Sequence, residues 1–211
     1  MRPERAAIER WLREDLGHHD VVNDLPGTAT GRIVAKEDGV AAGVEAATRV
    51  FEYLGVEAEA TIESGETVDS GEPVLRVCGP TEQVLRGERV GVNLLGHASG
   101  IATKTRRAVE AVEAVDDSVR VAATRKTTPG LRGIEKRAVA AGGGDTHRLD
   151  LSHAAMIKDN HVARLGLKEA VERVRDRASF TTMIEVESET MEEAVRAAEL
   201  GADIVLLDNM S

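Results

Sequence analysis

The C-terminal half of the chain alternates short apolar runs with amphipathic helical segments, and this alternation constrains the fold more than any other feature. The apolar runs cover residues 119–123, 154–157, 182–186 and 202–207, and helical patterns cover residues 133–141, 167–176 and 191–200. Repeated strand–helix units with apolar strands form a parallel sheet or barrel that helices cover. Because the active sites of such folds lie at the carboxyl ends of the strands, the polar residues that follow each run are candidate functional residues.

The first hundred residues have a different organisation. Helical patterns at 6–15 and 44–54 alternate with strand-like segments at 31–39, 56–62 and 73–78. A long helix is expected to begin at Thr81, and Gly91, Gly96 and Gly100 within it predict close packing against a neighbour. We therefore predict an α/β protein. An N-terminal α+β domain with a crossing helix would cover residues 1–105, and the first part of a parallel α/β barrel, with late strands missing, would cover 106–211.

Composition excludes several classes of protein. The net charge of −10 argues against a nucleic-acid partner, and the single cysteine, Cys78, excludes an internal disulfide and a multi-cysteine metal site. The N-terminal residues are charged and lack the apolar stretch of a signal peptide. No apolar run approaches the ~18 residues of a membrane helix. We expect a cytoplasmic protein that binds neither nucleic acid nor membrane.

Lysine is scarce in this acidic chain. Of the 27 cationic residues only 6 are lysines. An acidic, lysine-poor composition fits a protein that works in high salt, as in a halophilic archaeon, and equally fits a GC-rich genome that favours arginine codons. Because the lysines are so few, Lys126 and Lys158, which lie at predicted strand ends, are candidate functional residues.

Charged and hydroxyl residues cluster at the ends of the apolar runs and in one loop between them. They are, in chain order, Thr124, Arg125, Lys126, His147, Arg148, Lys158, Glu185, Glu187 and Asp208. The cations come first and the carboxylates last. Fixed cations beside hydroxyls suit a carboxylate or phosphate ligand. Carboxylates suit sugar hydroxyls or a divalent metal such as Mg²⁺.

Each of these residues also has a structural interpretation. The two cations after the first run could form an exposed turn, and the His-Arg pair could be surface residues. Lys158 could form an ion pair with Asp159, since an unpaired buried lysine is costly. Asp208 could cap a following helix. The two glutamates of the third run share a face of the strand, so one is expected to serve the site and the other a structural partner.

Specific motifs lie along essentially the whole chain. They are EDLGHHD (14–20), AKEDGVAAG (35–43), GERVGVNLLGHASGIAT (87–103), ATRKTTPGLR (123–132), AGGGDTHRLDL (141–151), MIKDNH (156–161), IEVES (184–188) and LLDNMS (206–211). In this order they resemble the quinolinate phosphoribosyltransferase family. The fourth and sixth stretches are the most specific.

The resemblance implies a pentosyltransferase. Such an enzyme moves the phosphoribosyl group of phosphoribosyl pyrophosphate to the ring nitrogen of quinolinate, with Mg²⁺. Carbon dioxide and pyrophosphate are lost, and nicotinate mononucleotide enters NAD biosynthesis. The implied substrate-binding residues are Arg89 (from the partner subunit), Thr124, Arg125, Lys126, His147, Arg148, Lys158, Glu187 and Asp208. Of these, Lys126, Lys158, Glu187 and Asp208 are the implied catalytic residues, and the two carboxylates would also hold Mg²⁺. The resemblance further implies a homodimer, or an oligomer built from dimers, with shared active sites.

The C-terminal end of the sequence leaves alternatives open. The chain stops at Ser211, after the fourth apolar run, whereas a closed barrel of this type has eight strands. We therefore expect a fragment or a truncated form that is inactive by itself. Three other functions remain open: a related phosphoribosyltransferase acting on another pyridine or base, a Schiff-base aldolase that uses Lys158, and an inactive binding subunit.

Overall fold

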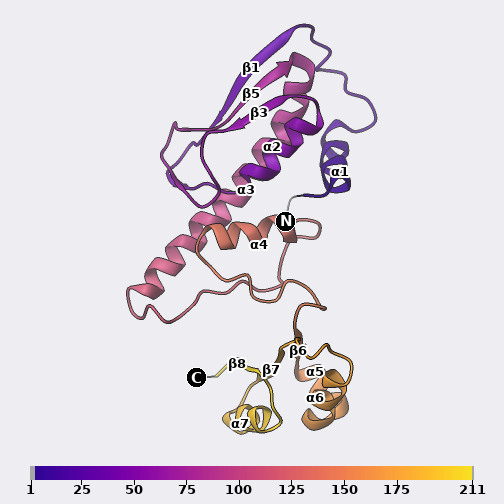
Figure 1. The fold of residues 1–211 in the computed structure, drawn as a ribbon, viewed down its shortest axis with the longest axis vertical. Coiled ribbons are helices and arrows are strands. Elements are labelled where there is room, and N and C mark those ends of the chain that lie inside the picture. The colour runs from indigo at the N-terminus through magenta and orange to yellow at the C-terminus, as the bar shows by residue number, and fades with distance from the viewer. Residues whose placement is uncertain (1–2, 211) are drawn as a thin grey trace. The chain divides into compact units, whose positions relative to one another are not determined.

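A computed structural model describes residues 3–210 and divides the chain into two compact units between His147 and Arg148 (Figure 1). The N-terminal unit carries the α+β part and the C-terminal unit carries a parallel sheet. The predicted domains begin at Met1 and end at Ser211, which lie outside the described residues. Their predicted boundary after residue 105 falls inside a long helix and stays a prediction.

The N-terminal unit combines helices with short antiparallel strands. Its elements are α1 (Arg5–Leu16), β1 (Thr28–Val34), β2 (Gly39–Val40), α2 (Val44–Tyr53), β3 (Glu57–Ala60), β4 (Thr67–Val68), β5 (Pro73–Pro80), α3 (Thr81–Glu113) and α4 (Arg132–Ala141). The strands β1, β5 and β3 form one antiparallel sheet in that order, and β2 pairs with β4. The helices predicted at 6–15 and 44–54 are confirmed, as is the long helix from Thr81.

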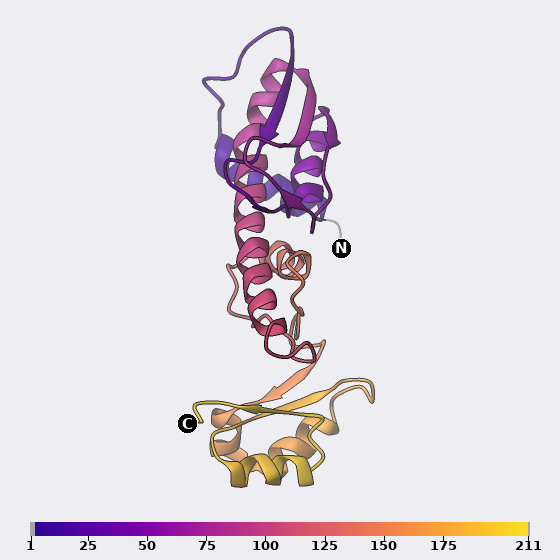
Figure 2. The same ribbon diagram turned by 90° about the vertical axis from the view of Figure 1, so that its left-hand side faces the viewer.

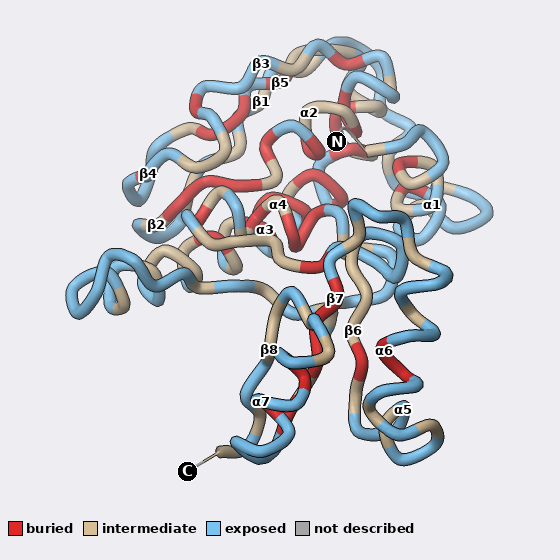
Figure 3. Tube along the Cα trace, turned by 60° about the horizontal axis from the view of Figure 1, so that its bottom comes forward, coloured by how far each residue is buried: buried red, intermediate tan, exposed pale blue. Residues whose placement is uncertain are grey.

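Helix α3 organises the core of this unit. It packs against α2 and α4, and Figure 3 shows buried stretches on all three helices. A Cβ atom on Gly91 would lie 2.9 Å from a ring carbon of Phe51, so glycine is needed for this close approach. The prediction of close packing is therefore confirmed for Gly91. It is wrong for Gly96 and Gly100, since a Cβ on either would have no neighbour within 4 Å among the described residues.

The first predicted strand of the C-terminal half, 119–123, does not form a ladder. Only one bridge is present, a parallel one between Ala122 and Asp145. The Asp145 N–H donates to Val121 O at 2.8 Å, and the Ala123 N–H donates to Asp145 O at 2.9 Å. Val119 remains 51% exposed. The strand prediction is wrong here because the apolar run has only this short partner segment among the described residues.

The C-terminal unit is a small parallel α/β layer structure. Its elements are β6 (Ala155–Ile157), α5 (Asp159–Leu165), α6 (Leu167–Arg175), β7 (Ile184–Ser188), α7 (Met191–Glu199) and β8 (Ile204–Leu207). The parallel strands lie in the order β6-β7-β8, which confirms the predicted parallel sheet. Its helices cover one face of the sheet (Figure 2). Ile157, Ile184 and Val186 fill the core between the sheet and these helices. Helix α5 was not predicted, since its seven residues carry little periodicity.

No helix within residues 3–210 is long and apolar enough to cross a membrane.

Candidate active site

Residues 123–128, which we name the anion-binding loop after the prediction made from the sequence, join the isolated bridge at Ala122 to the turn before α4. The Lys126 N–H donates to Thr124 Oγ1 at 3.1 Å, and the Thr127 N–H donates to Arg125 O at 2.9 Å. Arg132 Nε donates to Thr127 Oγ1 at 3.1 Å from the first turn of α4. The Thr124 hydroxyl thus accepts one backbone N–H and a backbone carbonyl accepts another, and neither bond uses the side chains of the two cations of the loop.

Arg125 and Lys126 offer positive charge from this loop. In the described part of the chain neither side chain forms an ion pair. Arg125 Nε is buried without a hydrogen-bond partner among those residues, whereas Lys126 is exposed. A buried guanidinium nitrogen that lacks a partner is costly unless a ligand supplies an acceptor. The interpretation of this stretch as an exposed turn therefore fails for Arg125.

Two residues of α4 that the sequence did not single out hold this loop. The Glu135 carboxylate accepts the Thr128 N–H at 3.2 and 3.3 Å and lies 3.0 Å from His97 Nε2 of α3. Lys136 is 3% exposed, and its ammonium donates to Ala123 O at 3.0 Å and also to Thr146 O. The one sequence signal for Lys136 is that it belongs to the only 6 lysines of the chain, a group whose scarcity makes each member a candidate for a specific role.

The pKa of Glu135 reflects two opposing effects. Burial raises this pKa, but the hydrogen bonds from Thr128 and the contact with His97 lower it by more, so that it lies below the ordinary value for glutamate. Glu135 is therefore a carboxylate at neutral pH, able to accept hydrogen bonds.

His147 ends the N-terminal unit in an unusual backbone conformation. Its φ of 49° lies in the left-handed region, which few residues other than glycine adopt. The Asp145 carboxylate accepts the His147 N–H at 2.7 Å and supports this turn. Strained backbone of this kind is found at binding and active sites more often than elsewhere. The backbone conformation of His147 is therefore consistent with its predicted role as a substrate-binding residue.

In the C-terminal unit, the candidate residues lie on the face of the sheet that its helices leave open. Ile157 points into the helix-covered core, so Lys158, the next extended residue, points to the opposite face. Arg148 is buried at 7% exposure, and its Nη2 lies 3.4 Å from the sulfur of Met156, which shares this open face. Alternation along β7 places Glu185 and Glu187 on the same face.

Lys158 pairs with Glu187. Its Nζ lies 2.5 Å from Glu187 Oε2, and its side chain is 43% exposed. The partner is thus a carboxylate on the neighbouring strand, and the suggested ion pair with Asp159 is wrong. Glu185 is buried while Glu187 is partly exposed, which fits one structural and one accessible glutamate.

Asp208 directly follows β8. Its N–H donates to Ser188 O at 3.0 Å and extends the parallel ladder by one residue. Alternation in this register places its side chain on the face of Glu187. No described helix follows for Asp208 to cap.

A metal at this face would be bound by few protein atoms. Within residues 3–210 no group of three or more histidine, cysteine or carboxylate side chains is arranged to hold a metal ion. Glu187 and Asp208 supply two hard oxygen donors, and Mg²⁺ typically uses one or two carboxylates together with water and substrate phosphates. The donor set therefore fits a Mg²⁺ ion that arrives with a phosphorylated substrate.

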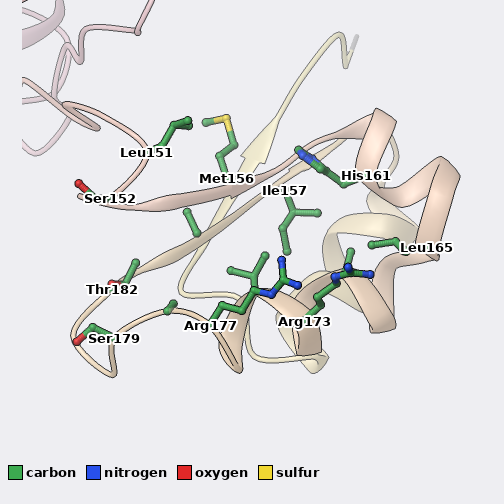
Figure 4. A pocket seen from close by; sticks show the side chains of 14 residues that line it. Leu151, Ser152, Met156, Ile157, His161, Leu165, Arg173, Arg177, Ser179 and Thr182 are labelled. Carbon is green, nitrogen blue, oxygen red and sulfur yellow. The ribbon is translucent and has the colours of Figure 1, made fainter.

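A separate cavity of about 550 Å³ lies beside β6 (Figure 4). Met156, Ile157, His161, Arg173 and Arg177 are among the residues that line it. None of the predicted site residues contributes to this lining. The cavity therefore does not belong to the charged cluster around Lys158.

Both halves of the chain match known family models. Residues 20–99 match the model described as quinolinate phosphoribosyl transferase, N-terminal domain, and residues 101–211 match its C-terminal domain. The chain belongs to the quinolinate phosphoribosyltransferase family. This membership confirms the resemblance and the fold class inferred from the motifs.

Individual relatives of this family support the assignment. The chain is 47% identical to a probable carboxylating nicotinate-nucleotide pyrophosphorylase of Methanothermobacter thermautotrophicus, over 97% of this chain and 75% of the relative. It is 41% identical to the human carboxylating nicotinate-nucleotide pyrophosphorylase, over 97% of this chain and 70% of that one. The crystal structure of NadC from Streptococcus pyogenes matches with a TM-score of 0.88 and 41% identity, over 98% of this chain and 75% of that chain.

The structure distributes the residues predicted from the family over both units. Arg89, Thr124, Arg125, Lys126 and His147 lie in the N-terminal unit, and Arg148, Lys158, Glu187 and Asp208 lie in the C-terminal unit. Arg89 is exposed on α3, where the side chain is accessible to another molecule. In the N-terminal unit, Thr124, Arg125 and Lys126 share one loop, whereas Arg89 lies apart from them on α3. In the C-terminal unit, Lys158, Glu187 and Asp208 share one sheet face.

Proposed function

We propose that this protein is a carboxylating nicotinate-nucleotide pyrophosphorylase. The reaction joins the ring nitrogen of quinolinate to C1′ of phosphoribosyl pyrophosphate. It releases pyrophosphate and carbon dioxide and gives nicotinate mononucleotide for NAD biosynthesis. Beyond family membership, one observation carries the proposal: the organised anion-binding loop presents Arg125 and Lys126 without an ion-pair partner in the described residues. A pyridine dicarboxylate needs several such cations.

The charges of the site suit both substrates. Arg125, His147 and Arg148 would bind the two carboxylates of quinolinate, because planar guanidinium groups match carboxylates in bidentate geometry. Thr124 would donate its hydroxyl to the same ligand. Lys126 would bind phosphate oxygens of phosphoribosyl pyrophosphate.

On the open face of the sheet, Lys158 would also meet the phosphoribosyl donor. Glu187 and Asp208 would accept hydrogen bonds from the ribose hydroxyls. The same two carboxylates would hold Mg²⁺, which when bound supplies positive charge beside the leaving pyrophosphate. The ion pair of Lys158 with Glu187 holds both side chains together on this face.

Catalysis then rests on electrostatics and positioning. As the bond from C1′ to pyrophosphate breaks, positive charge develops on the ribose ring, and Glu187 and Asp208 stabilise it. Lys126 and Lys158 stabilise the negative charge that develops on the leaving group. The new bond leaves the pyridine nitrogen cationic. When carbon dioxide leaves, the electron pair of the broken bond stays on the ring carbon beside that positive nitrogen, and this carbon then takes a proton from water, so the decarboxylation itself needs no dedicated base.

A second subunit would complete the carboxylate pocket. Arg89 is exposed on α3 and is apart in sequence from the other cations of the site. We propose a homodimer in which the Arg89 side chain of each protomer reaches the quinolinate bound by the other. Sedimentation analysis of the parent chain and of Arg89→Glu would test the assembly, and quinolinate affinity would test the shared site.

The aldolase alternative is disfavoured by the ion pair. An imine-forming lysine must be neutral to attack a carbonyl group. Lys158 Nζ instead lies 2.5 Å from the Glu187 carboxylate, so its amine is engaged by an ion-pair partner rather than open to a carbonyl group.

Two measurements on the same protein test the proposal. Calorimetry measures quinolinate binding, and release of labelled carbon dioxide in the presence of phosphoribosyl pyrophosphate and Mg²⁺ measures turnover. In contrast to the expectation from the sequence that the chain is inactive by itself, we expect binding, together with release that EDTA abolishes and excess Mg²⁺ restores. Binding without release would instead support the inactive binding subunit, and a protein that binds nicotinate but not quinolinate would support the related phosphoribosyltransferase.

A further inference from the structure

Helix α4 contacts both ends of the anion-binding loop through two consecutive residues. At the end of the loop, the Thr128 N–H donates to the Glu135 carboxylate at 3.2 Å. At its start, Ala123 O accepts from Lys136 Nζ at 3.0 Å. Residues 124–127, which include both cations, lie between these two contacts. Neighbouring side chains of one helical turn therefore span the whole loop.

Lys136 also joins the loop to a second candidate segment. Its ammonium donates to Thr146 O, the carbonyl directly before His147. A lysine that is 3% exposed and donates to backbone carbonyls has its charge compensated by fixed dipoles. The same side chain thus contacts the segment of Arg125 and the segment of His147, two of the proposed quinolinate ligands.

A cavity of about 340 Å³ lies between the loop and the helices α3 and α4, and Thr124, Lys126, Glu135 and Lys136 all line this space. The contacts that Glu135 and Lys136 make with the two ends of the loop are polar. His97 of α3 lies 3.0 Å from Glu135 and holds that carboxylate in turn.

We propose that Glu135 and Lys136 are positioning residues of this site. They fix the ends of residues 123–128, and Lys136 fixes the His147 segment, so that Arg125, Lys126 and His147 receive the anionic substrates in one preorganised geometry. Preorganisation raises affinity because the ligand does not have to order the loop. This inference rests on the proposed function for the identity of the ligand. That the loop is conformationally ordered rests on the contacts alone.

The first experiment tests loop order without a ligand. Hydrogen exchange is measured on the parent and on the variants Lys136→Met and Glu135→Ala. The amides of Lys126, Thr127 and Thr128 all donate hydrogen bonds in the structure. We expect their exchange to accelerate at least about tenfold in both variants while α2 and α3 keep parent rates. Parent rates at these amides would overturn the inference, whether or not quinolinate binds.

The second experiment tests the consequence for binding, by calorimetry with quinolinate. We expect Lys136→Met to raise the Kd about 10- to 100-fold, since small misplacement of binding groups has large effects. The number of sites per folded chain should stay the same. A residue that only stabilised the fold would lower the number of sites and leave the Kd unchanged, which would contradict a positioning role. Lys104→Met, at an exposed lysine of α3, is the matched control.

If Lys136→Met does not fold, Glu135→Gln keeps the inference testable. Its amide oxygen can still accept from Thr128, but the charge that attracts His97 is lost. We expect a smaller rise in the Kd, about three- to tenfold, and an unchanged Kd would overturn the proposal. Failure of the parent itself to bind quinolinate would count against the proposed function, and the exchange rates would still decide the positioning role.

Discussion

The two charged regions of this molecule, the anion-binding loop and the open face of the C-terminal sheet, differ in whether their cations form ion pairs. In the anion-binding loop, residues 123–128, the protein satisfies the backbone, and Arg125 and Lys126 form no ion pair within the described residues. On the open face of the C-terminal sheet, Lys158 and Glu187 neutralise each other at 2.5 Å. Under the proposed function, the loop would bind an anion directly, whereas the pair would exchange or share partners when a substrate arrives.

This difference suggests a division of work between the regions. Cations without an ion-pair partner attract a dianion and orient it, which is a binding role. A lysine held against a carboxylate contributes little net charge to the free protein. Under the proposed function, this lysine would become effective when a phosphorylated sugar enters between the two groups, with the ammonium toward phosphate and the carboxylate toward ribose. The comparison predicts that changes in the pair affect turnover most and that changes in the loop affect affinity most.

The largest effect is expected for Lys158→Ala. Removal of one charged group that stabilises the transition state typically lowers the rate about 10²- to 10³-fold. We expect carbon dioxide release to fall by this factor while the Kd of quinolinate changes less than about threefold. Lys168→Ala is the matched control, because Lys168 forms an exposed contact with Glu172 in the same unit. Near-parent turnover of Lys158→Ala would show that the ion pair is only structural.

The position of this pair could have been predicted more fully from the sequence. As the structural alternative to a functional role of Lys158, sequence reasoning named an ion pair with Asp159, its neighbour in the chain. In the parallel register Ile157 pairs with Val186, so the next residues along the two strands are Lys158 and Glu187. If the two apolar runs 154–157 and 182–186 are aligned at their C-terminal ends as neighbouring parallel strands, Lys158 and Glu187 are predicted to lie side by side.

The contacts of α4 were beyond sequence reasoning for a different reason. Ile134 and Ala138 carry the apolar periodicity of this helix, and the charged residues between them are read as solvent-exposed. Lys136 is buried because Ala123 O and Thr146 O, both distant in sequence, meet above it. Every residue has a backbone carbonyl, so a sequence pattern cannot indicate which carbonyls will accept hydrogen bonds from a buried side chain. The helices and the parallel strands, in contrast, follow from periodicity and were largely predicted.

An intermediate effect is expected for Arg125→Ala. A hydrogen bond to a charged group contributes about 1.5–3 kcal/mol, which corresponds to a rise of about 10- to 100-fold in the quinolinate Kd. Arg125→Lys keeps the charge but not the planar fork, so we expect an affinity between those of the parent and the alanine variant. Arg120→Ala is the control, since this nearby arginine is 81% exposed. If Arg125→Ala and the parent bound quinolinate with equal affinity, the loop would not have the binding role that distinguishes it from the Lys158–Glu187 pair.

The smallest effect concerns the loop anchor at Glu135 and its dependence on pH. The pKa of Glu135 in the folded protein lies below the ordinary value of 4.5, because hydrogen bonds from Thr128 and the contact with His97 outweigh the effect of burial. A lowered pKa stabilises the folded state above the unfolded pKa, and this stability is lost as the pH falls through the folded pKa. We therefore expect Glu135→Gln to be less stable than the parent by about 1 kcal/mol at pH 7.

The pH dependence separates this anchor from a simple packing contact. Below the ordinary glutamate pKa of 4.5 the parent begins to lose the contribution of its Glu135 carboxylate, so the difference in free energy of unfolding between parent and variant should shrink. Urea unfolding at pH 7 and at acid pH measures it, with Glu113→Gln at an exposed position of α3 as the control. A difference that stays constant over this range would mean that Glu135 holds the loop by shape alone. The anion-binding loop would then depend on Lys136 for its electrostatic anchor.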